Sequence, residues 1–184
     1  MRKFLGSIAL VAVLASVPAL AEAQRRAATT GGAKHEFGVD LGVGYSKYNG
    51  ADGGIVIATP LNVRVGLVTT GKMMWEPRFS LLFDTQGGAT TYAFNPGVNV
   101  LVSNSPGGHR RGMYLTGGAG LLLADNGANN GTAFSVNAGV GWRKPYGSAA
   151  WRYELGFQYT SESTDLGLPS NITIGARIGI SLWH

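Results

Sequence analysis

The chain has 184 residues, a formal net charge of +5 and no cysteine. Without cysteine it has neither a disulfide framework nor thiolate chemistry, and without a basic helix or an RNA-binding motif this charge argues against nucleic acid as a partner. Glycine is abundant, at 29 residues, while charged residues make up 14% of the chain, a composition that fits neither a helical bundle nor a disordered tail.

The N-terminal segment predicts export. Arg2 and Lys3 precede an apolar run over 4–20, and Ala21-Glu22-Ala23 provides a small-residue cleavage site. This pattern is typical of a secretory signal peptide, here covering residues 1–23. A transmembrane anchor is the alternative, but the run is marginal for the ~20 residues that a spanning helix needs.

The rest of the chain is a predicted periplasmic lead-in over 24–35 and one domain over 36–184, in which apolar and polar residues alternate. Alternation places the two kinds of side chain on opposite faces of a strand. Each alternating run has at least the ~9–11 residues that cross a bilayer at a tilt. The eight runs lie at about 36–47, 54–68, 73–84, 90–103, 112–124, 132–143, 150–161 and 172–184.

These runs predict an all-β fold, an eight-stranded antiparallel up-and-down transmembrane β-barrel with its first strand beside its eighth. No second apolar run is long enough for a spanning helix, and in lipid a closed barrel satisfies every backbone polar group. The fifth run is the least regular, because Leu121, Leu122 and Leu123 break its alternation. Since prolines stand inside three of the runs, we expect bulges at Pro60, Pro77 and Pro96.

The aromatic residues are expected to form a girdle at each end of the barrel. With both chain ends in the periplasm, all four tryptophans fall at the periplasmic end. The predicted girdle residues are Phe37, Trp75, Trp142, Trp151 and Trp183 on the periplasmic side, and Tyr45, Phe83, Tyr92, Phe134 and Tyr159 on the outer side. The alternative is a water-soluble barrel of the lipocalin kind, which would turn Arg64 and Glu154 outward and the tryptophans into the core.

Charged residues of both signs share the inward face, where unpaired charges are costly. In the expected register Glu154 lies opposite Arg177, and Asp40 approaches Arg177 across the closing seam. One interpretation is a hydrogen-bonded plug in the lower half of the lumen; the other is that the charges solvate a wet interior. The candidate ion-pair network is Asp40, Arg64, Glu76, Arg78, Arg152, Glu154 and Arg177.

The signal peptide, the eight amphipathic runs and the terminal strand together resemble the small outer-membrane β-barrel family of the OmpA/OmpX type. The family's C-terminal assembly signal is matched by Arg177, Gly179 and Leu182, whereas His184 stands where an aromatic residue usually ends the chain. The resemblance implies an exported, monomeric protein of the bacterial outer membrane. Its implied partners are membrane lipid, lipopolysaccharide and, through the terminal strand, the assembly machinery.

Catalytic chemistry has little support in the sequence. Barrel enzymes that modify lipid A need a histidine near the outer rim with a carboxylate to orient it, but His35, His109 and His184 are all predicted at the periplasmic end. We predict no catalytic residue, no cofactor and no metal site, although His35 and His184 meet at the predicted seam. The predicted function is a non-catalytic barrel of structural or surface-interaction type; the alternatives are a narrow pore for water, ions or small solutes and a lipid A-modifying enzyme.

Overall fold

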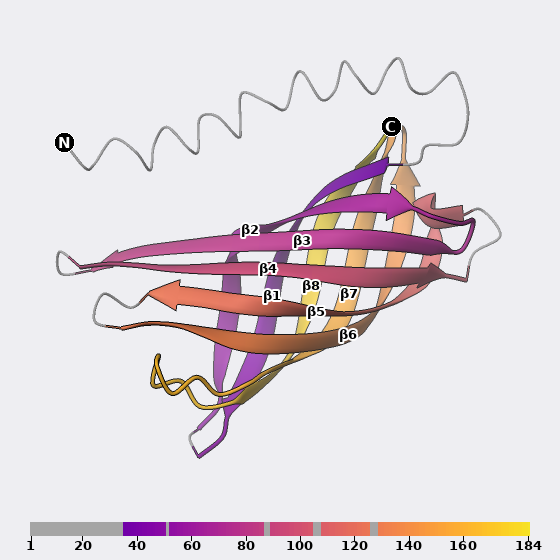
Figure 1. Ribbon diagram of the computed structural model, residues 1–184. Helices are drawn as coiled ribbons and strands as arrows, with labels where there is room; N and C mark the ends of the chain where they lie inside the picture. The colour runs from indigo at the N-terminus through magenta and orange to yellow at the C-terminus, as the bar shows by residue number, and fades with distance from the viewer. Residues whose placement is uncertain (1–34, 51, 87–88, 105–107, 126–128) are drawn as a thin grey trace, which may run out of the picture.

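The described residues form one closed barrel. The computed structural model describes residues 35–50, 52–86, 89–104, 108–125 and 129–184, without the side chains of 56–61, 82–86 and 89–91. Eight antiparallel strands follow one another around the barrel in chain order, as predicted, and both ends of the barrel domain lie at the same end (Figure 1). The strands are β1 (His35–Tyr48), β2 (Gly54–Val68), β3 (Met73–Gln86), β4 (Ala89–Ser103), β5 (Gly112–Asp125), β6 (Asn130–Tyr146), β7 (Ala149–Thr160) and β8 (Asn171–Trp183).

The strand bounds agree with the predicted runs to within a few residues. β1 begins at His35, so the predicted lead-in ends one residue earlier than expected, and the signal peptide lies outside the described residues. The leucine run does not interrupt β5, which pairs with β6 in one register from Gly112↔Arg143 to Asp125↔Asn130. A 3-10 turn, η2 (Gly108–Arg110), precedes β5. Among the described residues, no helix has the length and apolar character needed to cross a membrane.

The barrel closes through an unbroken seam between its first and last strands. β1 pairs with β8 from Glu36↔Trp183 to Tyr48↔Asn171 without a register shift. Because the register is continuous, the inward faces of both strands coincide over their whole length.

The three strand prolines behave differently from one another. The predicted bulge at Pro60 is present: the pairing of β1 with β2 shifts between Asp40 and Gly42, opposite the segment that holds Pro60. The bulges expected at Pro77 and Pro96 are wrong, since β3 and β4 pair in one register through both residues. The reason is that each strand residue directs its backbone N–H to one neighbouring strand only. A proline therefore removes one hydrogen bond to that neighbour, and the pairing with the other neighbour continues.

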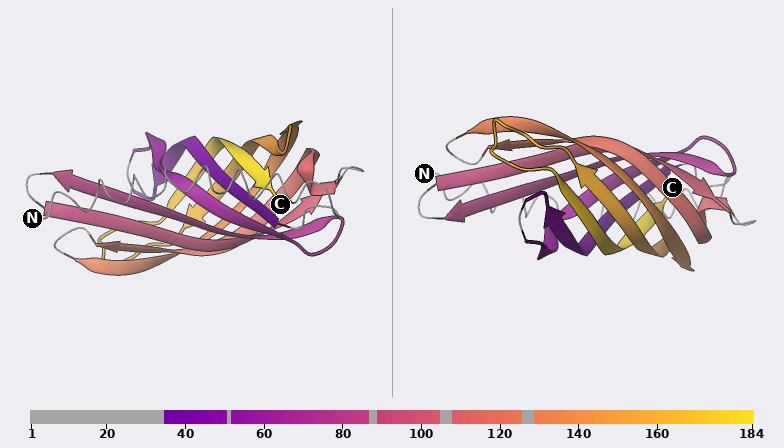
Figure 2. Two further views of the ribbon diagram at one scale, coloured as in Figure 1. Left: turned by 90° about the horizontal axis from the view of Figure 1, so that it is seen from above. Right: turned by 90° about the horizontal axis from the view of Figure 1, so that it is seen from below.

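β2 bends in its middle and leaves a fork in the wall. Among the described residues its second half pairs with β3 in a ladder that ends at Val63↔Phe79, while its first half pairs with β1 only. Figure 1 shows β2 turning from the direction of β1 to that of β3, and Figure 2 shows the β3–β4 tip lying apart from the β1–β2 tip. The end of the barrel away from the chain ends is therefore splayed.

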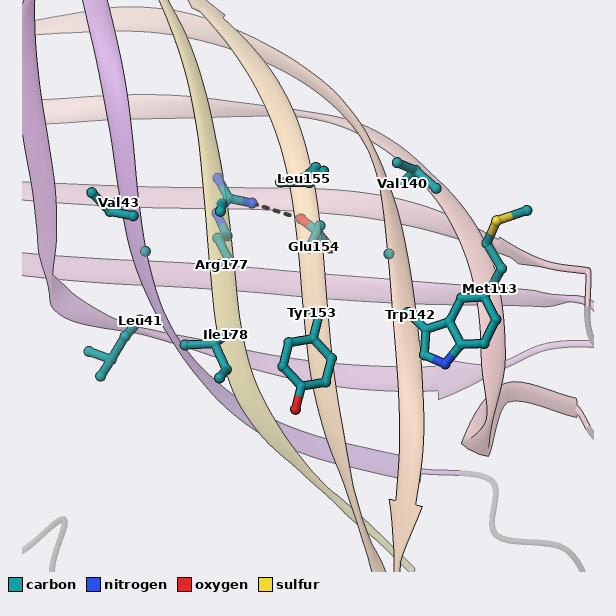
Figure 3. Close-up of a pocket in the computed structure, with 13 residues that line it drawn as sticks. Leu41, Val43, Met113, Val140, Trp142, Tyr153, Glu154, Leu155, Arg177 and Ile178 are labelled. Carbon is teal, nitrogen blue, oxygen red and sulfur yellow. Dashed lines mark hydrogen bonds and ion pairs between the residues drawn. The ribbon is translucent and has the colours of Figure 1, made fainter.

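The outer face of the barrel is apolar. Leu155, Ile174 and Leu115 are more than half exposed, and Leu41, Tyr153 and other outward side chains of β1, β5, β6, β7 and β8 border a shallow hollow of about 620 Å³ (Figure 3). Charged strand residues such as Arg64, Arg152 and Glu154 are buried inside, which excludes the lipocalin-like arrangement.

Most of the predicted girdle residues point outward. Trp75, Trp142 and Trp151 are 39–55% exposed at the end that holds the chain ends. Phe37 is half-buried on the outward parity of β1, and the opposite end carries exposed Tyr45, Tyr92, Phe134 and Tyr159. The side chain of Phe83 lies outside the described residues.

Trp183 is wrongly placed in that girdle by the sequence analysis. It is 3% exposed and packs inside the barrel with Met74, Leu101 and Tyr114. The physical reason is parity, because Trp183 shares its face of β8 with Arg177 and Gly179 rather than with the outward isoleucines.

Candidate functional site: an ion-pair network in the lumen

The candidate network lies on the inward face of five strands. Asp40 comes from β1, Arg64 from β2, Glu76 and Arg78 from β3, Arg152 and Glu154 from β7, and Arg177 from β8. Five of these seven residues are buried, at 4% exposure or less, and Arg78 and Arg177 are half-buried. The strand alternation therefore aims all seven side chains into one space that they largely fill.

Arg64 joins β2 to both strands of the closing seam. Its Nε donates to Asp40 Oδ2 at 2.7 Å, and another nitrogen donates to Ser181 Oγ at 3.0 Å. Its Nη1 pairs with Glu36 and lies 3.6 Å from a carboxylate oxygen of Glu76. One guanidinium thus connects β1, β2, β3 and β8 across the lumen.

Glu76 and Arg152 connect the opposite walls. Arg152 Nη1 donates to Glu76 Oε2 at 2.5 Å, and Arg78 Nε donates to the other oxygen of Glu76 at the same distance. Arg152 also donates to Tyr114 Oη, whose hydroxyl donates to Glu154 at 2.9 Å. Since Glu76 is fully buried, its charge is compensated by guanidinium groups rather than by water.

Glu154 pairs with three arginines of the network, namely Arg78, Arg152 and Arg177. It lies directly opposite Arg177 in the β7–β8 register and accepts a 3.0 Å hydrogen bond from it, drawn as a dashed line in Figure 3. Arg78 donates to both oxygens of Glu154 at 3.2 Å, a bidentate fork. Asp40 makes its hydrogen bond to Arg64 and lies opposite Gly179 in the β1–β8 register, and its negative charge also acts favourably on Arg177, as expected from the sequence.

Three partners of this network are absent from the sequence prediction. Glu36 is fully buried and accepts from Arg143 Nη2 at 2.5 Å, and Tyr114 bridges Arg152 and Glu154. Glu36 shares its strand parity with Asp40, and Arg143 shares the inward face of β6, so alternation alone was a sufficient signal for both. The sequence did not indicate this role for Tyr114, because an aromatic residue near a strand end is expected to belong to a girdle.

An apolar base lies inside the barrel at the end that holds the chain ends. Met74, Leu101, Tyr114 and Trp183 form one buried cluster, and the Arg143 guanidinium lies 4.8 Å from the Tyr114 ring centroid and 5.3 Å from that of Trp183. These are favourable cation–π distances. In the base, the charged side chain of Arg143 is therefore in direct contact with aromatic rings.

The turn beside this base is fixed by His109. The His109 Nε2–H donates to the carbonyl oxygen of Thr70 at 2.9 Å, and its backbone carbonyl accepts from Arg143 Nη1 at 2.9 Å. Burial lowers the pKa of His109 below its ordinary value, because the charged imidazolium loses its water. His109 thus connects two turns through its ring and its backbone carbonyl.

Glycine makes room for the large inward side chains. A Cβ atom at Gly38 would collide with the guanidinium of Arg64, and one at Gly141 with the phenol ring of Tyr114. The abundance of glycine on the inward face is therefore the steric counterpart of the arginine and tyrosine side chains that cross the lumen.

The remaining histidines meet at the seam. The rings of His35 and His184 stack with their centroids 5.6 Å apart, and their backbones exchange two 3.1 Å hydrogen bonds. Within the described ranges no group of three or more His, Cys, Asp or Glu side chains is arranged to hold a metal ion.

The comparisons with known proteins concern the fold. No family model matches the chain, and no curated protein matches its sequence. The solved structure of Neisserial surface protein A is similar with a TM-score of 0.56 and 8% identity, over 84% of this chain and all of that one. Ail, the attachment invasion locus protein of Yersinia pestis, is similar with a TM-score of 0.49 and 10% identity, over 83% of this chain and 99% of its own. The fold is that of the small outer-membrane β-barrels.

Proposed function

We propose that the protein is an integral outer-membrane barrel of structural or surface-interaction type, without catalytic activity, and that its lumen is closed. The observation that carries the proposal is the stack of buried groups inside the barrel: the apolar base, then the ion pairs around Glu76 and Glu154. These groups join walls that lie across the lumen from one another, for example Arg143 of β6 with Glu36 of β1.

The outer face supports placement in a lipid bilayer. Large apolar side chains stand exposed around the barrel, far beyond the scattered apolar residues of a soluble surface. An apolar band with aromatic residues toward both ends fits membrane lipid and lipopolysaccharide as its surroundings.

Buried pairs support a closed lumen because they resist opening. Separating them would leave charges uncompensated in a space with little water, at a cost of several kcal/mol per ion. A narrow pore for water, ions or small solutes would need Arg152, Glu76 and Arg64 to move aside together. The closed form is therefore the ground state expected from this packing.

Single-channel recording in planar bilayers tests the closed lumen. We expect no steady conductance from the reconstituted protein and no sugar-driven swelling of liposomes that contain it. A steady, wide conductance, or swelling above that of protein-free liposomes, would contradict the closed lumen and support the pore.

The end of the barrel away from the chain ends supports the surface-interaction part. A groove of about 1010 Å³ lies where the β1–β2 turn meets the start of β8. Tyr45, Tyr48 and Tyr159 line it together with Lys47 and Asp52. Tyrosine offers contact area with a polar tip and is enriched in binding surfaces.

The positions of the histidines support the non-catalytic part. His109 connects two turns, and His35 and His184 stand at the opposite end from the predicted outer rim. A lipid A mass spectrum from cells with and without the protein tests this: we expect identical spectra, and a new acylation or deacylation product would support an enzyme instead.

A further inference from the structure

On the side of the ion pairs that faces away from the chain ends, the lumen contains a chamber. Its volume is about 430 Å³, within the size range of small-molecule sites. Its walls are strand glycines, uncharged polar side chains and apolar residues such as Val43, Leu121 and Phe157. The polar residues are Ser46, Asn62, Ser80, Asn95, Asn99, Ser135, Asn137, Gln158 and Thr173.

The floor of this chamber is made of two guanidinium groups, those of Arg78 and Arg177. Both donate to Glu154, which also pairs with Arg152 at 2.5 Å. Glu154 thus serves three arginines, of which Arg78 and Arg152 also pair with Glu76, whereas Arg177 pairs with Glu154 alone among the described ion pairs.

Arg177 is the least compensated member. Its side chain is 29% exposed, against 10% for Arg78 and 1% for Arg152. Among the described contacts it donates one hydrogen bond, and its other nitrogens are not among the buried polar atoms that lack a partner. Its remaining donors therefore face the open space of the chamber.

The charge balance of the network also indicates that a positive charge is left uncompensated. Five arginines, namely 64, 78, 143, 152 and 177, meet four carboxylates, those of Glu36, Asp40, Glu76 and Glu154. With every carboxylate ionised, one positive charge remains in excess among the described side chains, which do not include that of Asp84. In a space of low dielectric such a charge attracts a counter-ion strongly.

We propose that the chamber binds a small polar molecule carrying one oxyanion, a carboxylate or a phosphate, with Arg177 as its principal contact. The guanidinium fork matches the two oxygens of either group, and the amides and hydroxyls of the walls serve the uncharged polar part of the ligand. A cation is disfavoured by the floor, and an apolar ligand would leave the remaining donors of Arg177 without partners. The proposal goes beyond the closed lumen, because the groups that close it also form the floor of a binding site.

The test is a titration of the full chain, folded in detergent micelles, with inorganic phosphate and separately with acetate at constant ionic strength. The readout is the NMR resonance of the Arg177 Nε–H group. We expect a saturable shift with at least one probe, and the tighter probe identifies the oxyanion class. A shift that does not saturate with either probe would overturn the proposal.

Two variants of Arg177 test whether this residue is the principal contact of the ligand. Arg177→Gln removes the excess charge and should weaken binding about tenfold or more, as expected for the loss of a charged hydrogen bond. Arg177→Lys, which keeps the charge without the fork, should fall between. Arg111→Gln is the matched control, an exposed arginine before β5 at the end that holds the chain ends, and should bind like the parent chain. Equal affinity of the parent and Arg177→Gln, measured by calorimetry on samples that migrate as folded barrels, would also overturn the proposal.

Discussion

At the scale of single residues, Glu76 has more arginine partners than any other carboxylate of the described network. It lies within 4 Å of four guanidinium groups, those of Arg64, Arg78, Arg143 and Arg152, and it is fully buried. Glu76→Gln keeps the shape and removes the charge. Since breaking a buried pair leaves its partners uncompensated, we expect a loss of about 3–5 kcal/mol in the free energy of unfolding, measured by urea titration in lipid vesicles.

The matched control makes the same chemical change on the surface. Glu162 follows β7 and is exposed, so Glu162→Gln should change the free energy of unfolding by no more than about 0.5 kcal/mol. If the two variants are equally stable, the charges of the lumen are solvated by water and the closed-lumen proposal loses its support.

The inward residues show which part of the site the sequence predicts. Strand parity placed Arg64, Glu154 and Arg177 in the lumen, because a side chain in a strand has only two directions. Parity does not give the height or reach of a side chain, and for that reason it did not predict the hydrogen bond of Asp40 to Arg64. Glu36 has the inward parity of Asp40, and parity alone would have placed it in the lumen.

At the scale of strands, the fork between β2 and β3 is the least secure part of the wall. Beyond Val63↔Phe79, the described residues of β3 pair with β4 only. Alternate N–H groups of an antiparallel strand point to alternate neighbours. Every second amide between residues 80 and 86 should therefore exchange with deuterium at least about tenfold faster than its neighbours, as resolved by NMR.

β7 provides the control for this measurement. It pairs in continuous register with β6 and with β8, so its interior amides should be uniformly protected. Uniform protection over residues 80–86 as well would show that the fork closes in solution.

The strands also show why the fold was predictable while the fork was not. Eight alternating runs and their connectors determine the number of strands and their order, because each run must bury or expose one whole face. The bend of β2 comes from a shift opposite a single segment with Pro60, and alternation is blind to it since the parity on both sides is the same. Prolines at 77 and 96 carried the same sequence signal without the same consequence.

At the scale of the whole molecule, the tryptophans test how the barrel sits in lipid. Trp75, Trp142 and Trp151 are exposed on the outer face near the end that holds the chain ends, and Trp183 is buried within the base. In four variants that each keep one tryptophan, with phenylalanine at the other three positions, we expect brominated lipids to quench the three outer tryptophans. Lipids brominated near the head group should quench them more than lipids brominated near the chain ends, as an interfacial girdle requires. Trp183 should stay unquenched by either lipid, because the strand wall separates it from the bilayer. Quenching of Trp183, or its absence for the other three, would contradict this placement of the inner and outer faces.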